Sequence, residues 1–451
     1  MTTYLNNDTI CAIASGGGMS AIALIRLSGP KSISTINQLF SKQLNKLSSH
    51  TAHFGTIKIE EKIIDEVVIT IFSKNKSFTG EETIEISCHG SNFIQQKILE
   101  ILISKGIRIA KPGEFTMRAF QNGKLDLSQA ESIADLIESE HESAHKNAMQ
   151  QLRGGFKKKL QSLRSDLIDF ASLIELELDF AEEDVEFANR DKLKDLLKHI
   201  NAEINTLISS FKLGNVIKNG IPVAIIGSPN VGKSTLLNTL LNDDKAIVSE
   251  IAGTTRDAIE DELIINGFKF RFIDTAGLRE TNDKIEKIGI KKTIEKIKES
   301  KITLLLLDGT KDINSQIKDI SSKELSLKNK IIYVVNKVDI KLNKSNNSKY
   351  IYISALKNIG IENLKKKIIE SYQLEKYAKD DTIITNIRHY DELQKTMFEI
   401  NEVLNGLNNN ISSDFLTANI RQALFHLGAI TGEVNTDDLL ANIFGKFCIG
   451  K

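Results

Sequence analysis

Three observations predict a multidomain protein that combines α+β and α/β architecture. Residues 1–120 contain short runs of β-branched residues bounded by turn residues, which is typical of strands. From about residue 121, apolar residues recur at gaps of three and four, which is typical of long amphipathic helices. Residues 218–375 alternate apolar strands with helices and predict a mostly parallel sheet. The length of 451 residues suits about three domains.

The N-terminal part, residues 1–120, is expected to be β-rich with one helix. Its predicted strands are TICAIAS, AIALIRLSG, DEVVITIFS and TIEIS, and its helix starts at Asn92 and closes on Gly106. The loop GGGMSA fits a dinucleotide-binding pattern loosely, but a strand rather than a helix follows it. A dinucleotide site is therefore not expected there.

Two stretches predict helices with one apolar face, here called a seam. The first seam is Leu160, Leu163, Leu167, Phe170 and Ile174. The second seam is Leu393, Met397, Ile400, Leu404 and Leu407. Between them lie the strands IPVAIIG, ITLLLLDG, KIIYVVNKVD and KYIYISA, and the hairpin ELIINGFKFRFID with its Asn266-Gly267 turn. We interpret residues 121–217 and 376–451 as two halves of one helical domain, with an α/β domain, residues 218–375, inserted between them. Separate helical domains on either side are the alternative.

Composition excludes several classes of protein. The 59 basic and 59 acidic side chains cancel, so any nucleic-acid contact must be local or shared with a partner. Cys11, Cys88 and Cys448 form no CxxC pair, which argues against a zinc ribbon or a disulfide framework. The start of the chain does not resemble a signal peptide and no run spans a bilayer, so a cytoplasmic protein without membrane contact is expected. HESAH, residues 141–145, matches a zinc-protease pattern, but its polar surroundings offer no third ligand.

The strongest motif is GSPNVGKST, Gly227 to Thr235, directly after the strand IPVAIIG. It fits the G-x4-G-K-[ST] phosphate loop in the strand–loop–helix context that this motif requires. Lys233 would reach the β- and γ-phosphates, and the Ser234 hydroxyl would ligate Mg²⁺.

Further motifs follow in the order of a P-loop GTPase (Ras-like) domain. DTAG begins at Asp274, which would hold Mg²⁺ through water, and Gly277 would sense the γ-phosphate. NKVD ends with Asp339, whose carboxylate would accept the two N–H donors of guanine and so reject adenine. Ser354-Ala355 would offer a backbone N–H to guanine O6. GTTRD suits a switch segment in which Thr255 completes the Mg²⁺ site.

Hydrolysis needs groups other than the usual glutamine. Leu278 stands where many related domains carry a water-orienting Gln. Asn230 would bind a monovalent cation beside the phosphates, in place of an arginine finger. Glu286 would act through a water, although from the residues alone a solvated helix position is the alternative.

Several stretches resemble the MnmE (TrmE) family of tRNA-modification GTPases across nearly the whole chain. They are DTICAIAS, SFTGEETIEISCHG, KPGEFTMRAFQNGKLDLSQAE and the terminal CIGK, together with the GTPase motifs. The resemblance implies an N-terminal domain that binds a tetrahydrofolate one-carbon derivative and forms a homodimer. It implies a heterotetramer with the flavoprotein MnmG that installs a carboxymethylaminomethyl-type group at C5 of uridine-34 in certain tRNAs, with no role for DNA. The loop GGGMSA departs from the Pro/Arg-bearing loop of many relatives.

The resemblance also implies roles for individual residues. K⁺ ligation falls on Asn230, Ser249, Ile251 and Thr254, and Mg²⁺ ligation on Ser234 and Thr255. Folate contacts fall on Arg26, Glu85, Lys124 and Lys451, and catalytic roles on Glu286 and Cys448. The expected GTP-binding residues are Asn230, Val231, Gly232, Lys233, Ser234, Thr235, Ser249, Glu250, Ile251, Ala252, Gly253, Thr254, Thr255, Asp274, Thr275, Ala276, Gly277, Asn336, Lys337, Val338, Asp339, Ser354 and Ala355.

Two other functional classes compete with this reading. A regulatory GTPase that binds ribosomal particles would need an RNA-binding appendage such as a KH module, and the chain after residue 376 stays helical. A mechanochemical scaffold that dimerises through its GTPase domains would leave the folate stretches without a role. The ending FCIGK fits a prenylation box poorly, and Cys448 close to a terminal lysine is expected to be functional, with covalent chemistry left open.

Overall fold

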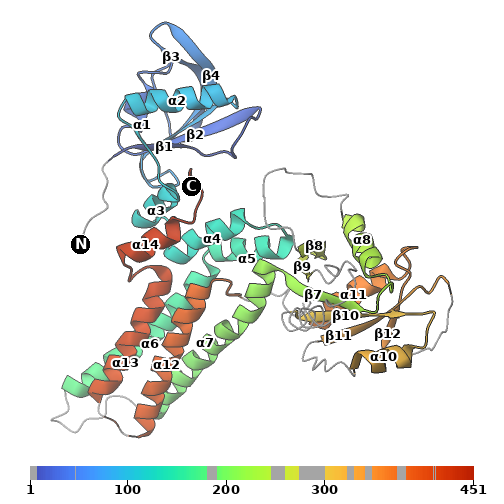
Figure 1. Cartoon of the computed structure of the whole chain (residues 1–451). Helices are drawn as coiled ribbons and strands as arrows, with labels where there is room; N and C mark the ends of the chain where they lie inside the picture. The colour runs from blue at the N-terminus through green and yellow to red at the C-terminus, as the bar shows by residue number, and fades with distance from the viewer. Residues whose placement is uncertain are drawn as a thin grey trace, which may run out of the picture. The chain divides into compact units, whose positions relative to one another are not determined.

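The computed structural model describes residues 8–45, 47–179, 190–244, 260–273, 300–321, 330–340, 348–372, 382–409, 411 and 413–450. It confirms the predicted mixed fold class, with a β-rich N-terminal part, long helices and a mostly parallel sheet (Figure 1). The chain divides into two compact units, 1–138 with 149–201 and 392–451, and 139–148 with 202–391. Among the described residues, no helix combines the length and the apolar character needed to cross a membrane.

The N-terminal part of the first unit is built on a six-stranded sheet with the order β3-β4-β5-β2-β1-β6. Its strands are β1 (Ile10–Ile13), β2 (Ile22–Ser28), β3 (Thr51–Ile59), β4 (Lys62–Phe72), β5 (Thr83–His89) and β6 (Arg108–Ile109). Its helices are α1 (Ser32–Ile36), α2 (Asn92–Ser104) and α3 (Glu114–Gln121). The predicted strands and the predicted helix are present, and β3 was not predicted.

Alternation along β2 sends its side chains to the two faces of this sheet in turn. Ile25 and Leu27 are fully buried in a core that also contains residues of α1 and α2. Arg26 and Ser28, one position out of phase, point to the opposite face because successive strand side chains alternate. This second face carries two of the predicted folate residues, Arg26 and its register partner Glu85.

The first unit also contains the following helices, in whole or in part. They are α4 (Leu127–Ile137), α5 (Glu142–Leu152), α6 (Gly155–Asp179), α7 (Arg190–Asn219), α12 (Ile387–Asn408), α13 (Ser413–Thr431) and α14 (Asp437–Phe444). The division between the units falls within α5, α7 and α12. All five residues of the first predicted seam, in α6, are buried as expected.

The second predicted seam, in α12, needs a correction. Leu393, Ile400 and Leu407 are buried, but Met397 and Leu404 are only half-buried. The buried line runs instead through Thr396 and Val403, at 0% and 1% exposure. Thr396 is accommodated because its hydroxyl donates to the Glu392 carbonyl at 2.8 Å, which satisfies this buried polar group.

The second unit contains a six-stranded sheet with the order β12-β11-β10-β7-β9-β8, in which only β8 and β9 pair antiparallel. The strands are β7 (Ile221–Gly227), β8 (Glu260–Ile265), β9 (Phe268–Ile273), β10 (Ile302–Asp308), β11 (Lys330–Asn336) and β12 (Tyr350–Tyr352). The helices are α8 (Lys233–Asp244), α10 (Ile313–Ser321) and α11 (Ile361–Tyr372). Residues of α8 and α11 join one apolar cluster and residues of α10 join another, so helices cover both sheet faces.

Candidate functional site

The phosphate loop lies where β7 ends and α8 begins. Asn230 and Gly232 adopt left-handed backbone angles, with φ of 61° and 100°. At Gly232 a Cβ atom would lie 2.4 Å from the Asn336 side-chain nitrogen, so both the backbone angle and the lack of space require glycine. These two left-handed residues let the chain turn tightly into the N-terminus of α8, where free N–H groups favour an anion.

Lys233, the first residue of α8, lies folded over this loop. Its ammonium donates to the carbonyls of Gly227 at 3.0 Å and Ser228 at 3.1 Å. Burial lowers the pKa of Lys233 from its ordinary value, because the charged form loses solvation. A phosphate would restore the missing counter-charge, which makes this lysine a natural partner for an anionic ligand.

Asn336, at the end of β11, joins the phosphate loop to the next loop of the sheet. Its side-chain nitrogen donates to the Val231 carbonyl at 2.8 Å, and its oxygen accepts from the Ala355 N–H at 2.9 Å. The residue is 3% exposed, so both bonds are shielded from water. One side chain, that of Asn336, thus joins the phosphate loop to the loop that contains Ala355.

Asp339 lies exposed beside Ser354, whose hydroxyl hydrogen bond holds the pKa of that carboxyl below its ordinary value. Ser354 itself is buried at 1% exposure and accepts from the Lys357 N–H at 3.2 Å. The carboxylate is therefore ionised and free to accept hydrogen bonds from a base. Its neighbour Lys337, with φ of 68°, turns toward Asp308 at the end of β10.

The structure thus brings together Asn230 to Thr235, Asn336 to Asp339, and Ser354-Ala355. Ser234 is exposed and Thr235 half-buried on the first turn of α8, so the Ser234 hydroxyl is available to a cation. The remaining predicted nucleotide and metal residues lie outside the described residues, namely Ser249, Glu250, Ile251, Ala252, Gly253, Thr254, Thr255, Asp274, Thr275, Ala276, Gly277 and Glu286.

In the N-terminal part, two predicted folate residues contact each other. Arg26 on β2 and Glu85 on β5 are register partners, and an Arg26 nitrogen lies 2.8 Å from Glu85 Oε1. The guanidinium also lies 5.8 Å from the Phe78 ring centre and 5.7 Å from that of Phe115. Both charged side chains are about one-fifth exposed, so neither is an ordinary surface charge. A ligand carboxylate would have to share Arg26 with Glu85.

Lys124 lies against the loop that carries the SFTGEE stretch. Its ammonium donates to the Asn75 carbonyl, and Gly80 packs against its side chain. Within the same stretch, Thr79 contacts the Ser28 hydroxyl at 2.7 Å, and Glu81 accepts from Ser28 at 2.7 Å. The stretch is therefore joined by hydrogen bonds both to β2 and to the residues before α4.

The C-terminal tail lies on the N-terminal part of the first unit. The Cys448 carbonyl accepts from the Gly113 N–H at 3.3 Å, and a Cβ at Gly450 would lie 2.2 Å from the Ile13 carbonyl. Cys448 itself is exposed. The terminal Lys451 lies outside the described residues.

The HESAH segment packs on the β8–β9 hairpin. His141 Nδ1 lies 3.1 Å from the Gly267 carbonyl oxygen, and the Ser143 N–H donates to the same carbonyl at 3.1 Å. Lys269 on β9 bonds Glu140 at 2.7 Å and Glu262 at 2.6 Å. The segment therefore has a structural contact that its sequence pattern did not suggest.

Comparison with known proteins decides the family. A model of the MnmE helical domain matches residues 127–448, and a model of the GTP-binding protein TrmE N-terminus matches residues 9–124. The tRNA modification GTPase MnmE of Cytophaga hutchinsonii is 53% identical, over 100% of this chain and 99% of its own. That of Christiangramia forsetii is 52% identical, over 99% of each chain. The chain belongs to the MnmE family of tRNA modification GTPases. The resemblance inferred from the motifs is confirmed.

Solved structures also resemble parts of this MnmE-family chain. Aquifex aeolicus Era bound to GDP and AlF4⁻ is 26% identical, covering 40% of this chain and 66% of its own, with a TM-score of 0.27. A GTP-binding protein of Sulfolobus solfataricus in complex with GDP is 20% identical, covering 62% and 85%, also with a TM-score of 0.27. The MnmE-family assignment rests on the family models and on the full-length relatives.

Proposed function

We propose that this GTPase of the MnmE family binds GTP between the phosphate loop and the loops after β11 and β12. The supporting observation is the Asn336 side chain, which bonds Val231 on one side and Ala355 on the other. Lys233 and Ser234 would bind the phosphates and Mg²⁺, and Asp339 would accept the guanine N–H groups. The domain division at residues 1–120, 121–217, 218–375 and 376–451 belongs to the same proposal.

Hydrolysis is proposed to depend on K⁺. Asn230 is exposed at the top of the phosphate loop in a left-handed conformation, which suits a side chain that turns toward bound phosphates and a cation. A cation there would supply the charge that an arginine finger supplies elsewhere. Ser249, Ile251, Thr254, Thr255 and Glu286 complete this part of the proposal from sequence resemblance.

The GTPase cycle is proposed to control a one-carbon transfer to uridine-34 of tRNA, together with MnmG in the cytoplasm. Arg26, Glu85 and Lys124 would contact a tetrahydrofolate derivative in a homodimer formed by the N-terminal domains. The seating of the tail beside Ile13 supports a functional C-terminus, because Ala12 is the register partner of Arg26. Cys448, exposed on that tail, would therefore lie within reach of the same region. Lys451 completes this part of the proposal from sequence resemblance.

Steady-state GTP hydrolysis in matched K⁺ and Na⁺ buffers tests the first part of the proposal. We expect GTP turnover in K⁺ to exceed turnover in Na⁺ about tenfold, because K⁺ supplies the positive charge that an arginine finger supplies in other GTPases. The Asn230→Ala variant should lose this difference. Equal turnover of the native chain in both buffers would contradict the K⁺ assignment.

Nucleoside analysis of tRNA tests the second part. Cells carrying only the Cys448→Ser variant should contain unmodified uridine-34, while the purified variant hydrolyses GTP at the native rate. Because Cys448 is exposed, the substitution should not disturb folding. Fully modified tRNA in those cells would remove Cys448 from the mechanism.

A further inference from the structure

The end of β10 is joined tightly to the proposed base-recognition loop. Asp308 and Asn336 are register partners in the β10–β11 pair, and the Gly309 N–H donates to the Asn336 carbonyl at 2.8 Å. A Cβ atom at Gly309 would lie only 2.8 Å from that carbonyl oxygen. The two chain segments therefore approach too closely for any side chain at residue 309.

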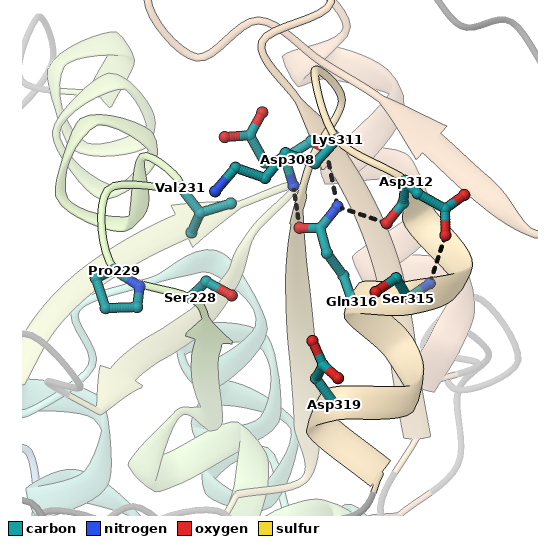
Figure 2. Close-up of a pocket in the computed structure, with 9 residues that line it drawn as sticks. All are labelled: Ser228, Pro229, Val231, Asp308, Lys311, Asp312, Ser315, Gln316 and Asp319. Carbon is teal, nitrogen blue, oxygen red and sulfur yellow. Dashed lines mark hydrogen bonds between the residues drawn. The ribbon is translucent and has the colours of Figure 1, made fainter.

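Gln316 on α10 fixes the backbone of Asp308 from the other side. Its side-chain oxygen accepts from the Asp308 N–H at 2.9 Å, and its nitrogen donates to the Asp308 carbonyl at 3.0 Å (Figure 2). Gln316 and Asp308 are both buried, at 9% and 6% exposure. This two-point contact holds Asp308 in place without using its carboxylate.

The Asp308 carboxylate is thereby left to bind neighbouring donors. Oδ1 accepts from the N–H of Thr310 at 3.0 Å and from its hydroxyl at 2.6 Å. Oδ2 accepts from the Lys337 ammonium at 2.8 Å. Burial alone would raise the pKa of Asp308, but hydrogen bonds from Lys337 and Thr310 outweigh burial and lower it, so the group is ionised at neutral pH.

Lys337 lies between Asn336, which contacts the phosphate loop, and Asp339, which is the proposed acceptor for guanine. A lysine usually keeps its ammonium in water and leaves its stem free to move. Here the ammonium is held by Asp308, and the backbone of Lys337 is held in the left-handed region. The Lys337 side chain is therefore fixed at both ends, two positions before the proposed base acceptor Asp339.

We infer that Asp308 is a positioning residue for nucleotide binding, which fixes Lys337 so that its stem forms one wall of the guanine site. This inference rests on the proposed guanine site at Asp339. Asp308 itself touches no base. Asp308 also lines a cavity of about 220 Å³ together with Ser228, Pro229 and Val231 of the phosphate loop (Figure 2).

The test is Asp308→Asn in the full chain, with GDP binding measured by titration calorimetry and GTP hydrolysis measured at saturation. Asparagine keeps the shape and the Thr310 contact but loses the charge that holds Lys337. We expect the Kd for GDP and the KM for GTP to rise about tenfold, equivalent to about 1.4 kcal/mol. The kcat should stay within about twofold of native, because the phosphate-binding groups are untouched.

Asp312→Asn is the matched control. Asp312 lines the same cavity and accepts from the Ser315 N–H at 2.7 Å, but it makes no contact with Lys337. Its loss should change the Kd for GDP less than about twofold. A similar effect of the two variants would overturn the inference, because a general change of cavity charge would then explain it.

A double-mutant cycle with Lys337→Met tests whether Asp308 affects nucleotide binding through Lys337 or through the stability of the fold. Methionine keeps much of the stem and cannot bind Asp308, so Asp308→Asn should have almost no further effect on GDP binding in that background. Additive effects of the two substitutions would overturn the inference, as would a native Kd in the Asp308→Asn variant alone.

Asp339→Asn distinguishes a failure of this inference from a failure of the proposed guanine site. Asparagine would offer a donor where guanine also offers one, so this variant should prefer xanthosine diphosphate over GDP. If it does not, the guanine site at Asp339 is wrong, and the inference about Asp308 falls with it. If it does while Asp308→Asn binds GDP normally, only the inference about Asp308 is overturned.

Discussion

Arg118 on α3 is surrounded by carboxylates, and its removal should destabilise the N-terminal part of the chain. Its guanidinium bonds Asp8 at 2.7 Å, Glu114 at 3.0 Å and Glu81 at 3.2 Å. Burial works against the charged form of Arg118, but these acids outweigh burial and raise its pKa above the ordinary value. The arginine side chain is 5% exposed, so its positive charge is almost wholly desolvated.

The substitution Arg118→Met keeps the length of the side chain and removes the charge. Glu114, at 3% side-chain exposure, would then lose one of its two arginine partners. Removing one partner from a buried charge network costs about 3–5 kcal/mol, because uncompensated charge remains in the interior. We expect the free energy needed to expose the backbone amides of β2 and β5 to solvent to fall by this amount.

Arg108 supplies a matched control, because it also binds Asp8 and Glu114, at 2.8 and 2.7 Å, but is 36% exposed. Water can replace much of the hydrogen bonding that Arg108 supplies to these carboxylates, so Arg108→Met should lower the same free energy by only about 1 kcal/mol. Native-state hydrogen exchange on the full chain measures both losses at the β2 and β5 amides. Equal losses for the two variants would refute the reasoning that desolvation sets the magnitude.

Three further predictions concern other parts of the chain. Hydrogen bonds from Arg108 and Arg118 lower the pKa of Glu114 from its ordinary value despite burial. Its contribution to stability is therefore present above the ordinary pKa and lost as the pH falls through the lowered one, and Glu114→Gln should flatten this acid limb in hydrogen exchange. Gly232→Ala should weaken GDP binding at least about tenfold in calorimetry, because both the backbone angle and the Asn336 side chain oppose a Cβ. In α6, Leu167→Ala at 0% exposure should cost about 2–5 kcal/mol of helical stability by urea titration, whereas Leu173→Ala at 36% exposure should cost under about 1 kcal/mol.

Most of the fold class could be predicted from the sequence, because period and turn chemistry are local properties. The spacing of Leu160 to Ile174 predicted the buried face of α6, and Asn266-Gly267 predicted a hairpin turn, in which both residues have positive φ. The seam of α12 was partly wrong, because the buried line through Thr396 and Val403 has the same gaps of three and four as the predicted one, and spacing alone cannot choose between two adjacent positions. Thr396 could then replace Met397 in the buried line because a backbone carbonyl satisfies its hydroxyl.

Motif order likewise identified the segments that form the candidate nucleotide site, but not how they contact one another. That Asn336 bonds both Val231 and Ala355 depends on the parallel sheet, which brings the carboxyl ends of its strands to one edge. Asp308 gave no motif signal beyond an acidic residue at the end of the buried strand ITLLLLD. Asp308 contacts Lys337 because β10 and β11 pair side by side in the sheet, although the two residues are far apart in the chain.

The sequence by itself determined the phosphate loop, the positions of its glycines and the family to which the chain belongs, because each is written in a short run of residues. Tertiary structure alone decided that Arg26 pairs with Glu85, that the C-terminal tail packs beside Ile13, and that Asp308 holds Lys337. Such pairs join residues from separate elements, and local spacing carries no information about which elements meet. Their geometry depends on strand order, register and burial, which only the folded chain establishes.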